Sequence, residues 1–330
     1  MEFDQLLSSG CMTAGERPGD EGKSLREEIL TGLRKVRKCI PSKFLYDARG
    51  SRLFDEICKL DEYYPTRTES SIMQRYGSQM ARCLSDCRVL VELGSGSSEK
   101  TRILLDHLCQ LQCYLPLDIS VSHLLAAADR MQLDYPQLEV HPIVCDFTSS
   151  IRIPMHFRHQ PICTYFPGST IGNLEPADAL ELLREIQQLS RERSGLLIGF
   201  DLQKETEILE LAYNDARGVT AAFNLNLLHR INRELGADFD VDQFAHVAYY
   251  DPQWARVEIY IESLCHQCVV IAGEEFFFRR GERILTEYSH KYTVDGFAKL
   301  ARAAGLFMQN HWTDERAHFA VAYLTTNGGE

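Results

Sequence analysis

The chain has 330 residues, of which 45% are hydrophobic and 25% are charged, so it can form one large domain or two modest ones. Its net charge of −12 argues against a general nucleic-acid-binding protein, which needs a basic surface for phosphates. No apolar run reaches the ~18 residues of a membrane-spanning helix, and no secretory signal pattern is found. The eleven cysteines lack small-disulfide spacing, which predicts reduced thiols. We therefore expect a cytoplasmic monomer without nucleic-acid or membrane partners.

Two capping boxes predict helix starts in the first part of the chain. Before them, residues 1–22 are polar, and this composition predicts a flexible arm. Ser24 with Glu27 then forms a pattern in which a hydroxyl and a carboxyl satisfy backbone N–H groups at the start of an amphipathic helix. Thr66 with Glu69 repeats this pattern and predicts a second helix start.

From residue 88 onward, strand-like and helix-like segments alternate along the chain. Such alternation is typical of parallel βαβ units in a doubly wound α/β sheet. The expected strands are 88–93, 114–118, 140–145, 162–166 and 195–201. The expected helices are 99–110, 121–132 and 176–192.

After Asp201 this alternation stops, and residues 204–290 predict an inserted lobe. Apolar and polar residues alternate over 256–262, which indicates a half-exposed antiparallel strand. The last two strands predict a C-terminal hairpin that completes the sheet. The expected elements are helices 204–213, 219–236 and 294–304, and strands 256–262, 269–271, 275–278, 306–312 and 317–324.

A glycine-rich turn, ELGSG at 92–96, follows the first strand of the α/β pattern. Backbone N–H groups and a helix N-terminus in such a turn can approach a polar nucleotide ligand. A phosphate-binding loop fits poorly, because Glu99 stands where its second glycine is required. A dinucleotide fingerprint also fits poorly, because Glu99 again replaces the last glycine beside the pyrophosphate. A carboxylate there would repel either ligand.

Acidic residues stand at the ends of successive strands. Glu92 precedes the glycine turn, Asp118 can accept both ribose hydroxyls, and Asp146 can accept an adenine amine beside the ring of Phe147. Each acid alone could cap a helix. Their recurrence at the ligand-binding edge of a doubly wound sheet instead favours S-adenosylmethionine, which has no phosphate and is cationic at sulfur. The prediction is a methyltransferase; the alternative from another class is a silent sensor of S-adenosylmethionine or of an amino acid.

Six motifs then occur together within residues 24–325. They are YDARGSRLF at 46–54, EYYPTRTE at 62–69, ELGSG at 92–96, FPGSTIGN at 166–173, GVTAAFN at 218–224 and TEYSHKY at 286–292. This set resembles the ergothioneine-pathway histidine Nα-methyltransferase family. The resemblance implies S-adenosylmethionine-dependent trimethylation of the α-amine of free L-histidine to hercynine, without a metal.

The same resemblance implies two domains and two sets of binding residues. A class I methyltransferase domain would comprise 68–203 and 292–330, and a smaller α+β substrate-binding lobe would comprise 23–67 and 204–291. The residues implied for S-adenosylmethionine are Gly94, Gly96, Lys100, Asp118, Asp146 and Phe147. The residues implied for the amino acid are Tyr46, Tyr63, Gly168, Asn173, Tyr213, Ile259, Glu287 and Ser289.

Within the amino-acid set, Tyr46 would lie near the α-amine, and Asn173 with Tyr213 would bind the carboxylate. Tyr46 and Asn173 are the two residues that we expect to act in catalysis. Tyr63, Glu287 and Ser289 would contact the imidazole. Residue chemistry supports the last assignment, since a carboxylate accepts a ring N–H and a hydroxyl can donate or accept at the other nitrogen.

Alternative interpretations remain open for several of these residues. Asn173 could cap the following helix, and Glu287 with Ser289 could lie on an exposed strand face. Ile259 occupies a position where the family commonly has methionine. This apolar exchange conserves volume but bears on substrate choice, so an enzyme of the same family acting on tryptophan or a derivative is the second hypothesis.

The expected chemistry needs alignment rather than a strong base. The α-amine must be neutral to attack a methyl group that is already activated. We expect water to remove the proton, with Tyr46 as a possible intermediary. Aromatic faces such as those of Tyr46 and Phe147 suit the growing trimethylammonium group.

Overall fold

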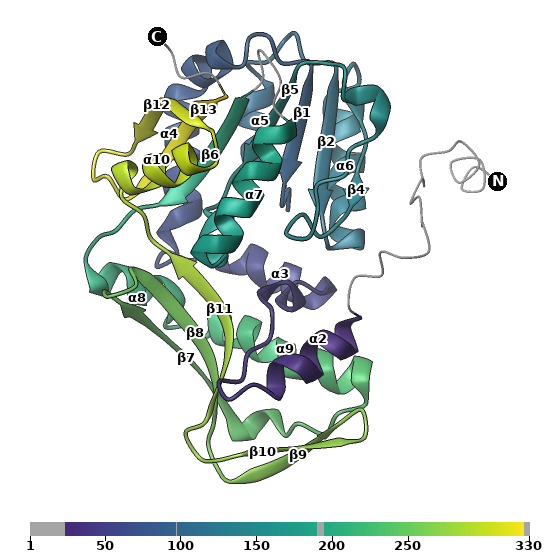
Figure 1. Ribbon diagram of the computed structural model, residues 1–330, viewed down its shortest axis with the longest axis vertical. Coiled ribbons are helices and arrows are strands. Elements are labelled where there is room, and N and C mark those ends of the chain that lie inside the picture. The colour runs from purple at the N-terminus through teal and green to yellow at the C-terminus, as the bar shows by residue number, and fades with distance from the viewer. Residues whose placement is uncertain (1–23, 97, 190–194, 327–330) are drawn as a thin grey trace, which may run out of the picture.

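The computed structural model describes residues 24–96, 98–189 and 195–326. The expected arm at 1–22 and the end of the expected helix at 190–192 lie outside this described part. The main sheet occupies the upper half of the molecule in Figure 1, and two smaller sheets with their helices occupy the lower half.

The main sheet is eight-stranded, with the order β12-β13-β6-β5-β1-β2-β3 and with β4 also paired to β2. Its strands from β6 through β3 are parallel, and β13 runs antiparallel to both β6 and β12. This confirms the expected doubly wound sheet with a C-terminal antiparallel hairpin. The strands are β1 (Val89–Leu93), β2 (Cys113–Asp118), β3 (Glu139–Val140), β4 (Ile143–Val144), β5 (Ile162–Phe166), β6 (Gly195–Asp201), β12 (Phe307–Thr313) and β13 (Phe319–Thr325).

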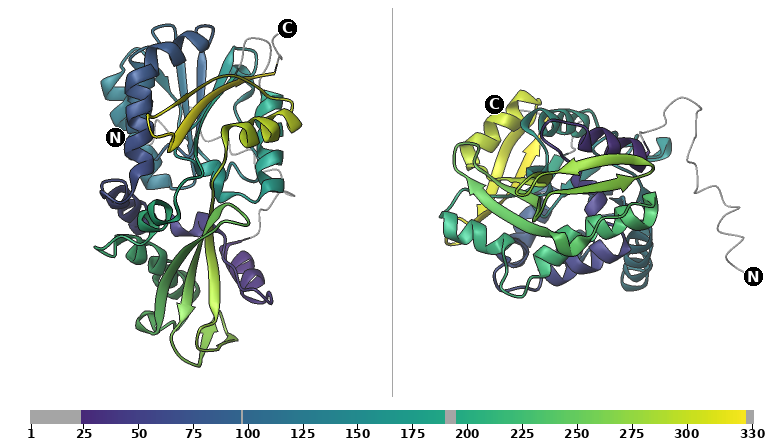
Figure 2. Two further views of the ribbon diagram at one scale, coloured as in Figure 1. Left: turned by 90° about the vertical axis from the view of Figure 1, so that its left-hand side faces the viewer. Right: turned by 90° about the horizontal axis from the view of Figure 1, so that it is seen from below.

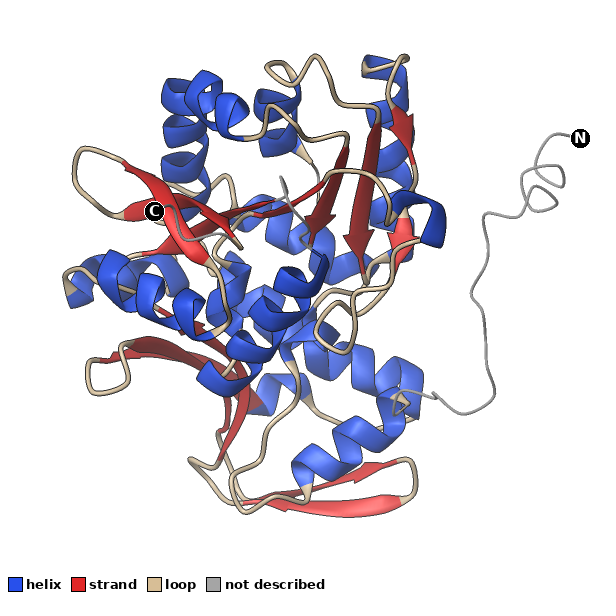
Figure 3. Ribbon diagram, turned by 45° about the horizontal axis from the view of Figure 1, so that its top comes forward, coloured by secondary structure: helices blue, strands red, loops and turns tan. Residues whose placement is uncertain are grey.

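Helices cover both faces of this sheet, as Figure 3 shows. Side chains that alternate along β1 explain the two layers: Val89 and Val91 pack on one face, and Leu90 packs on the other. The first face carries α7 and α10, and the second carries α4 and α5. The helices are α4 (Tyr64–Cys83), α5 (Glu99–Leu105), α6 (Val121–Asp134), α7 (Pro176–Leu189) and α10 (Val294–Ala303).

The lower half has its own hydrophobic core, to which residues from Ile29 to Tyr64 and from Leu209 to Ile284 contribute. A three-stranded sheet, β11-β8-β7, and the β9-β10 hairpin form its strands (Figure 2). The residue boundaries of the two expected domains stay predictions. The elements are α2 (Leu25–Leu33), α3 (Ala48–Ile57), α8 (Thr206–Tyr213), α9 (Val219–Leu235), β7 (Phe244–Asp251), β8 (Arg256–Ser263), β9 (Gln267–Ile271), β10 (Glu274–Phe278) and β11 (Arg283–His290).

Local sequence signals explain several element boundaries. The capping box of Ser24 and Glu27 forms at the start of α2, as expected. The second expected box is wrong, because α4 already begins at Tyr64 and Glu69 is a fully buried carboxylate. The expected strand 140–145 is split into β3 and β4 at Pro142, which has no N–H to donate to a ladder.

One further expectation needs correction, and the three elements α3, β7 and β11 were not expected. Helix α5 ends at Leu105 rather than at residue 110, because the chain turns there to bring its next residues to β2. Helix α3 was not expected, although Asp47 caps it by accepting from Gly50 N at 2.7 Å. Strand β7 was also missed, since its residues are half-buried without the alternation that marks a strand.

Among the residues that the structure describes, no helix combines the length and the apolar character needed to cross a membrane. The ten described cysteines are all free thiols.

Candidate active site

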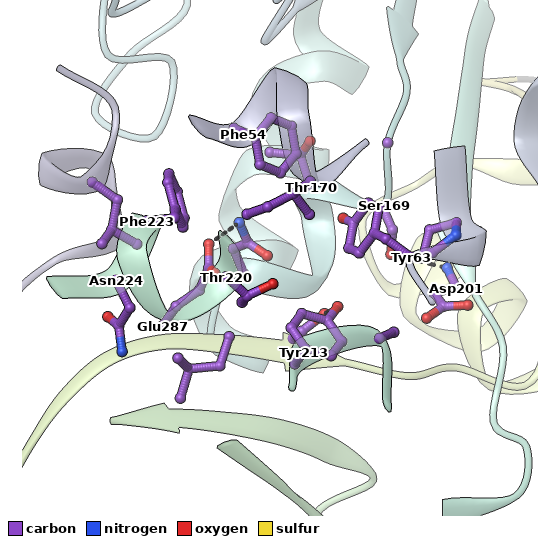
Figure 4. Close-up of a pocket in the computed structure, with 18 of the residues that line it drawn as sticks. Phe54, Tyr63, Ser169, Thr170, Asp201, Tyr213, Thr220, Phe223, Asn224 and Glu287 are labelled. Atoms are coloured by element: carbon purple, nitrogen blue, oxygen red, sulfur yellow. Dashed lines mark hydrogen bonds between the residues drawn. The ribbon is translucent and has the colours of Figure 1, made fainter. Parts of the chain in front are cut away.

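A cavity that is partly open to solvent lies where the carboxyl ends of β5 and β6 meet the smaller lobe. Figure 4 shows Glu287 and Phe223 on one side of this cavity and Ser169 and Asp201 on the other. The structure brings together every residue that we expected to contact the amino acid, because all of them line the cavity: Tyr46, Tyr63, Gly168, Asn173, Tyr213, Ile259, Glu287 and Ser289.

Strand β11 supplies the polar wall of the cavity. Glu287 and Ser289 are two residues apart and therefore point to the same face of the strand. A register shift between Leu285 and Glu287 sets their position, and Ile259 of β8 lies directly opposite Glu287. The strand face is thus enclosed against the cavity, and the alternative of an exposed strand face is wrong.

Glu287 pairs with Asn173 on the wall of the cavity. The Asn173 amide Nδ2 donates to Glu287 Oε1 at 2.9 Å. Burial raises the pKa of Glu287 to about 8, although the nearby Lys291 ammonium acts in the opposite direction. Asn173 is not a helix cap, because it ends the short 3₁₀ turn Thr170–Asn173 and α7 begins only at Pro176. Its amide therefore serves the cavity wall, where it donates to Glu287, rather than a helix end.

Tyr213 and Ser289 form a second polar pair. Their hydroxyl oxygens are 2.7 Å apart, and both accept from Lys291 Nζ, at 3.0 Å for Tyr213 and 2.7 Å for Ser289. Lys291 was not among the expected site residues. Its place two residues after Ser289, just beyond the end of β11, was the available signal, since side chains of an extended chain alternate with period two.

Behind this pair lies a buried cluster of charges that includes Asp201, at the carboxyl end of β6. Lys204 Nζ is 2.7 Å from Asp201 Oδ1, and Lys291 Nζ is 2.8 Å from Asp201 Oδ2. Burial opposes ionisation of Asp201, but the two ammonium groups outweigh it and lower the pKa of this carboxyl. Burial lowers the pKa of Lys204 to about 8, against the attraction of Asp201. Tyr64 donates to Asp201 Oδ2 at 2.6 Å.

Aromatic rings form the remaining wall. The ring of Tyr46 packs edge-on against Phe54 at 5.6 Å and Phe223 at 5.4 Å between centroids, and Tyr63 meets Tyr213 at 6.1 Å. Burial raises the pKa of Tyr46 well above its ordinary value, so its hydroxyl is neutral at physiological pH. Phe54 and Phe223 line the cavity and were not expected to do so.

The expected cofactor residues gather at the carboxyl ends of β1, β2 and β4. Gly94 and Gly96 adopt positive φ angles of 68° and 50°, and a Cβ on Gly96 would meet nothing within 4 Å. Gly96 N donates to Asp118 Oδ2 at 3.1 Å, which fixes the carboxylate beside the turn. A Cβ on Gly94 would lie 3.6 Å from Phe147 Cε1. Open backbone, a carboxylate and an aromatic ring fit a nucleoside ligand without phosphate.

Two residues of this edge, Phe147 and Asp146, have neighbours that we did not expect. Phe147 does not line the amino-acid cavity but packs against Phe166 at 5.6 Å. Asp146 is 2.9 Å from Lys43 Nζ, a contact between the lobes that we did not expect. Burial acts against ionisation of Asp146, but hydrogen bonds from Thr148 and Lys43 outweigh it and lower the pKa of this carboxyl.

Glu92 does not face a ligand. Its carboxylate is buried below the turn, where it accepts from Thr101 Oγ1 at 2.8 and 2.7 Å and from the Tyr114 hydroxyl. Burial raises the pKa of Glu92 to about 8, partly offset by these hydrogen bonds. The expectation that this acid suits a cationic ligand is therefore wrong; it stabilises the loop.

Glu69 links the cofactor edge to the cavity. Lys100 Nζ forms an ion pair with its carboxylate, and Gly168 N donates to both of its oxygens at 3.1 and 3.0 Å. One buried carboxylate thus connects the start of α5 with the loop after β5. A potential metal-binding group in the described part of the chain, Cys113 with Glu139 and His141, contributes nothing to the cavity lining.

The sequence matches the family model described as "Histidine-specific methyltransferase, SAM-dependent" over residues 25–326. The chain is 41% identical over 307 residues to the histidine N-alpha-methyltransferase of Mycobacterium tuberculosis, with 91% of this chain and 94% of the relative covered. The corresponding enzyme of Mycolicibacterium smegmatis is 40% identical over 306 residues, with 91% and 94% covered. An L-tryptophan methyltransferase of Psilocybe serbica is 26% identical over 355 residues, with 92% and 94% covered. The chain therefore belongs to the family of histidine-specific, S-adenosylmethionine-dependent methyltransferases.

Proposed function

We propose that this enzyme trimethylates the α-amine of free L-histidine and forms hercynine. The observation that carries the proposal is the enclosed pairing of Glu287 with Asn173 on the wall of a cavity beside the carboxyl end of the main sheet. A buried carboxylate there can accept an imidazole N–H, which an apolar ring cannot supply. The similarity to the two mycobacterial histidine N-alpha-methyltransferases supports the same substrate.

The charges around the cavity support one orientation of histidine. The ring would lie toward Glu287, and the α-carboxylate would lie toward Tyr213 and the lysines behind it. The α-amine would then lie between them, near Tyr46 and the backbone of Gly168. Gly168 also contacts the cofactor edge, since a Cβ on it would lie 3.5 Å from Lys100 Nζ.

S-adenosylmethionine, when bound, supplies an electrophilic methyl group. The residues that would hold it are Gly94, Gly96, Lys100, Asp118, Asp146 and Phe147. The cavity residues orient the amine and exclude water from it. The neutral Tyr46 hydroxyl can contact the amine but is a weak base, so the proton leaves to water. The faces of Tyr46, Phe54 and Phe223 suit the cationic product.

The proposal is tested by incubating the enzyme with S-adenosylmethionine and L-histidine and following the products by mass spectrometry over time. The expected result is successive mono-, di- and trimethylated histidine, with hercynine as the end product. Methylation that stops after one or two groups would contradict trimethylation. Cofactor binding without any methylated histidine would refute the substrate.

The second candidate is methylation of tryptophan or a derivative. Ile259, which replaces the methionine expected opposite Glu287, and the similarity to an L-tryptophan methyltransferase favour this candidate. A panel of single amino acids, each assayed by release of S-adenosylhomocysteine, separates the two. The proposal requires that histidine exceed tryptophan in kcat/KM.

The proposal also includes a cytoplasmic monomer that binds neither nucleic acid nor membranes. A net charge of −12 supports this, because the surface would repel polyanions. Free thiols at the ten described cysteines are consistent with a reducing compartment. Light scattering of the purified enzyme would test its monomeric state.

A further inference from the structure

A buried group of two lysines and one aspartate lies behind the Tyr213–Ser289 wall of the cavity. The side chains of Asp201, Lys204 and Lys291 are 0%, 3% and 1% exposed. Asp201 is ion-paired with both lysines, so one carboxylate faces two ammonium groups. With both lysines protonated, this cluster carries one excess positive charge. Its carboxylate, Asp201, lines the cavity together with Tyr213 and Ser289, whereas neither lysine does. An unbalanced buried charge is costly unless a ligand completes the pairing.

The hydrogen-bond donors of Lys291 are fully assigned. An ammonium group has three donors, and here they go to Asp201 Oδ2, the Tyr213 hydroxyl and Ser289 Oγ. Both hydroxyl oxygens therefore accept from Lys291. One hydroxyl donates to the other across 2.7 Å. Whichever direction this bond takes, one O–H of the pair remains without an acceptor within this group.

The remaining O–H gives the cavity a hydrogen-bond donor backed by positive charge. Such a site suits an anionic oxygen, because charge-assisted hydrogen bonds are stronger than neutral ones. On the proposed substrate the α-carboxylate is the group of this kind. Building on the proposed function, we propose that Lys291 is a positioning residue that orients the Tyr213–Ser289 pair. Ser289 then donates to Tyr213 and stays available to accept from the ring, while the free Tyr213 O–H donates to the α-carboxylate and thereby selects free amino acids.

The role of Lys291 differs from that of Lys204. Lys204 pairs with the other oxygen of Asp201 and donates to the Tyr64 hydroxyl at 2.6 Å. It adds positive charge to the cluster, yet its hydrogen bonds do not reach Tyr213 or Ser289. Replacing each lysine in turn therefore distinguishes the effect of net charge from the effect of hydroxyl orientation.

The test compares the variants Lys291→Met and Lys204→Met, each of which leaves Asp201 paired with one lysine. Each protein is assayed with L-histidine and with L-histidinamide, which has a neutral carboxamide. For Lys291→Met we expect the preference for the acid in kcat/KM to fall roughly 30-fold, mainly through KM, as expected for a lost charge-assisted hydrogen bond. For Lys204→Met we expect a fall of only about threefold, since its charge acts through Asp201.

A structural role alone would lower yield or stability but would leave the preference for the acid unchanged. An unchanged preference in Lys291→Met overturns the proposal, and so does an equal fall in both variants. The affinity for S-adenosylmethionine, measured by calorimetry, reports whether each variant is folded. If Lys291→Met does not fold, Lys291→Gln replaces it; its amide can donate to one hydroxyl, and an intermediate fall is expected.

The wild-type enzyme provides a check that needs no variant. It should prefer L-histidine over both L-histidinamide and histamine by roughly 30-fold or more, and no preference overturns the proposal. The comparison applies to any amino acid that the enzyme methylates, paired with its amide. Turnover of another amino acid with the same acid preference would refute the histidine substrate while supporting the role of Lys291.

Discussion

The two ends of the amino-acid cavity differ in how their buried charges are paired. At one end, Glu287 accepts from the Asn173 amide, and the described residues offer it no ion pair. At the other end, Asp201 is paired with both Lys204 and Lys291. The first end has a carboxylate without a cation, and the second has a cation in excess.

This difference indicates how a protein can place a carboxyl group at one end of a cavity and positive charge at the other without losing its stability. Glu287 avoids an isolated charge because burial raises its pKa to about 8, so it can take up a proton. At the second end, Asp201 balances the charge of one of the two lysines, so only one ammonium charge remains uncompensated. An amino acid with an N–H-bearing ring and a carboxylate would complete both ends at once.

The largest effect is expected at the end that lacks a cation. Replacement of Glu287 with glutamine keeps the size of the side chain but removes the carboxylate. At pH 8.5, above the pKa of Glu287, we expect kcat/KM for histidine to fall by roughly 10²-fold, because a hydrogen bond to a charged group is lost. The affinity for S-adenosylmethionine, measured by calorimetry, should stay within about twofold.

Glu92→Gln is the matched control, since Glu92 is also buried with a pKa raised to about 8 but supports the glycine turn. We expect this variant to weaken cofactor binding more than histidine binding. If Glu287→Gln impaired cofactor and histidine equally, the assignment of Glu287 to the ring end would be wrong.

The next prediction concerns how the free energy of unfolding depends on pH through Glu287, at the end of the cavity without an ion pair. Between the ordinary pKa of 4.5 and about 8, native Glu287 retains a proton that the unfolded chain releases, so its contribution to stability falls as pH rises. Glu287→Gln should therefore be more stable than wild type by on the order of 5 kcal/mol at pH 8.5 and equal to it near pH 4. Urea unfolding at several pH values measures the difference. A constant difference across pH would show that the carboxyl titrates normally.

A smaller effect is expected at the cofactor edge. Asp118→Asn removes a carboxylate that is fixed by Gly96 N at 3.1 Å and is expected to accept the ribose hydroxyls. The dissociation constant of S-adenosylmethionine should rise roughly tenfold. The KM for histidine at saturating cofactor should change little. A larger change in the KM for histidine than in the affinity for S-adenosylmethionine would show that Asp118 acts on the amino-acid cavity rather than on the cofactor edge.

These two regions also differ in how well the sequence predicts them. The cofactor edge follows from local patterns, because a strand, a glycine turn and a helix lie within about 20 consecutive residues. The fold class could be predicted for the same reason. Two predictions for this region were wrong, namely the capping role of Glu69 and the ligand role of Glu92. In both cases burial of the side chain in the folded protein overrides the local motif.

The cavity could not be derived from local patterns alone. Its walls come from segments as distant as Tyr46 and Ser289, and the resemblance to a family, rather than spacing, indicated which residues to expect. Lys291 and Asp201 were missed because a lysine and an aspartate read as surface residues in a sequence. Their mutual pairing across 90 residues becomes visible only in the folded chain.

The smallest expected effect concerns the apolar neighbour of Glu287. Ile259 lies opposite Glu287 in the register and is 3% exposed. Ile259→Met conserves volume, so the free energy of unfolding should change by less than about 1.5 kcal/mol. Methionine is unbranched and adaptable, and we expect it to lower the KM for histidine by a few-fold at most. Steady-state assays with histidine and tryptophan measure the ratio. If this substitution changed the preferred amino acid, apolar shape rather than the charge of Glu287 would control selectivity at the ring end.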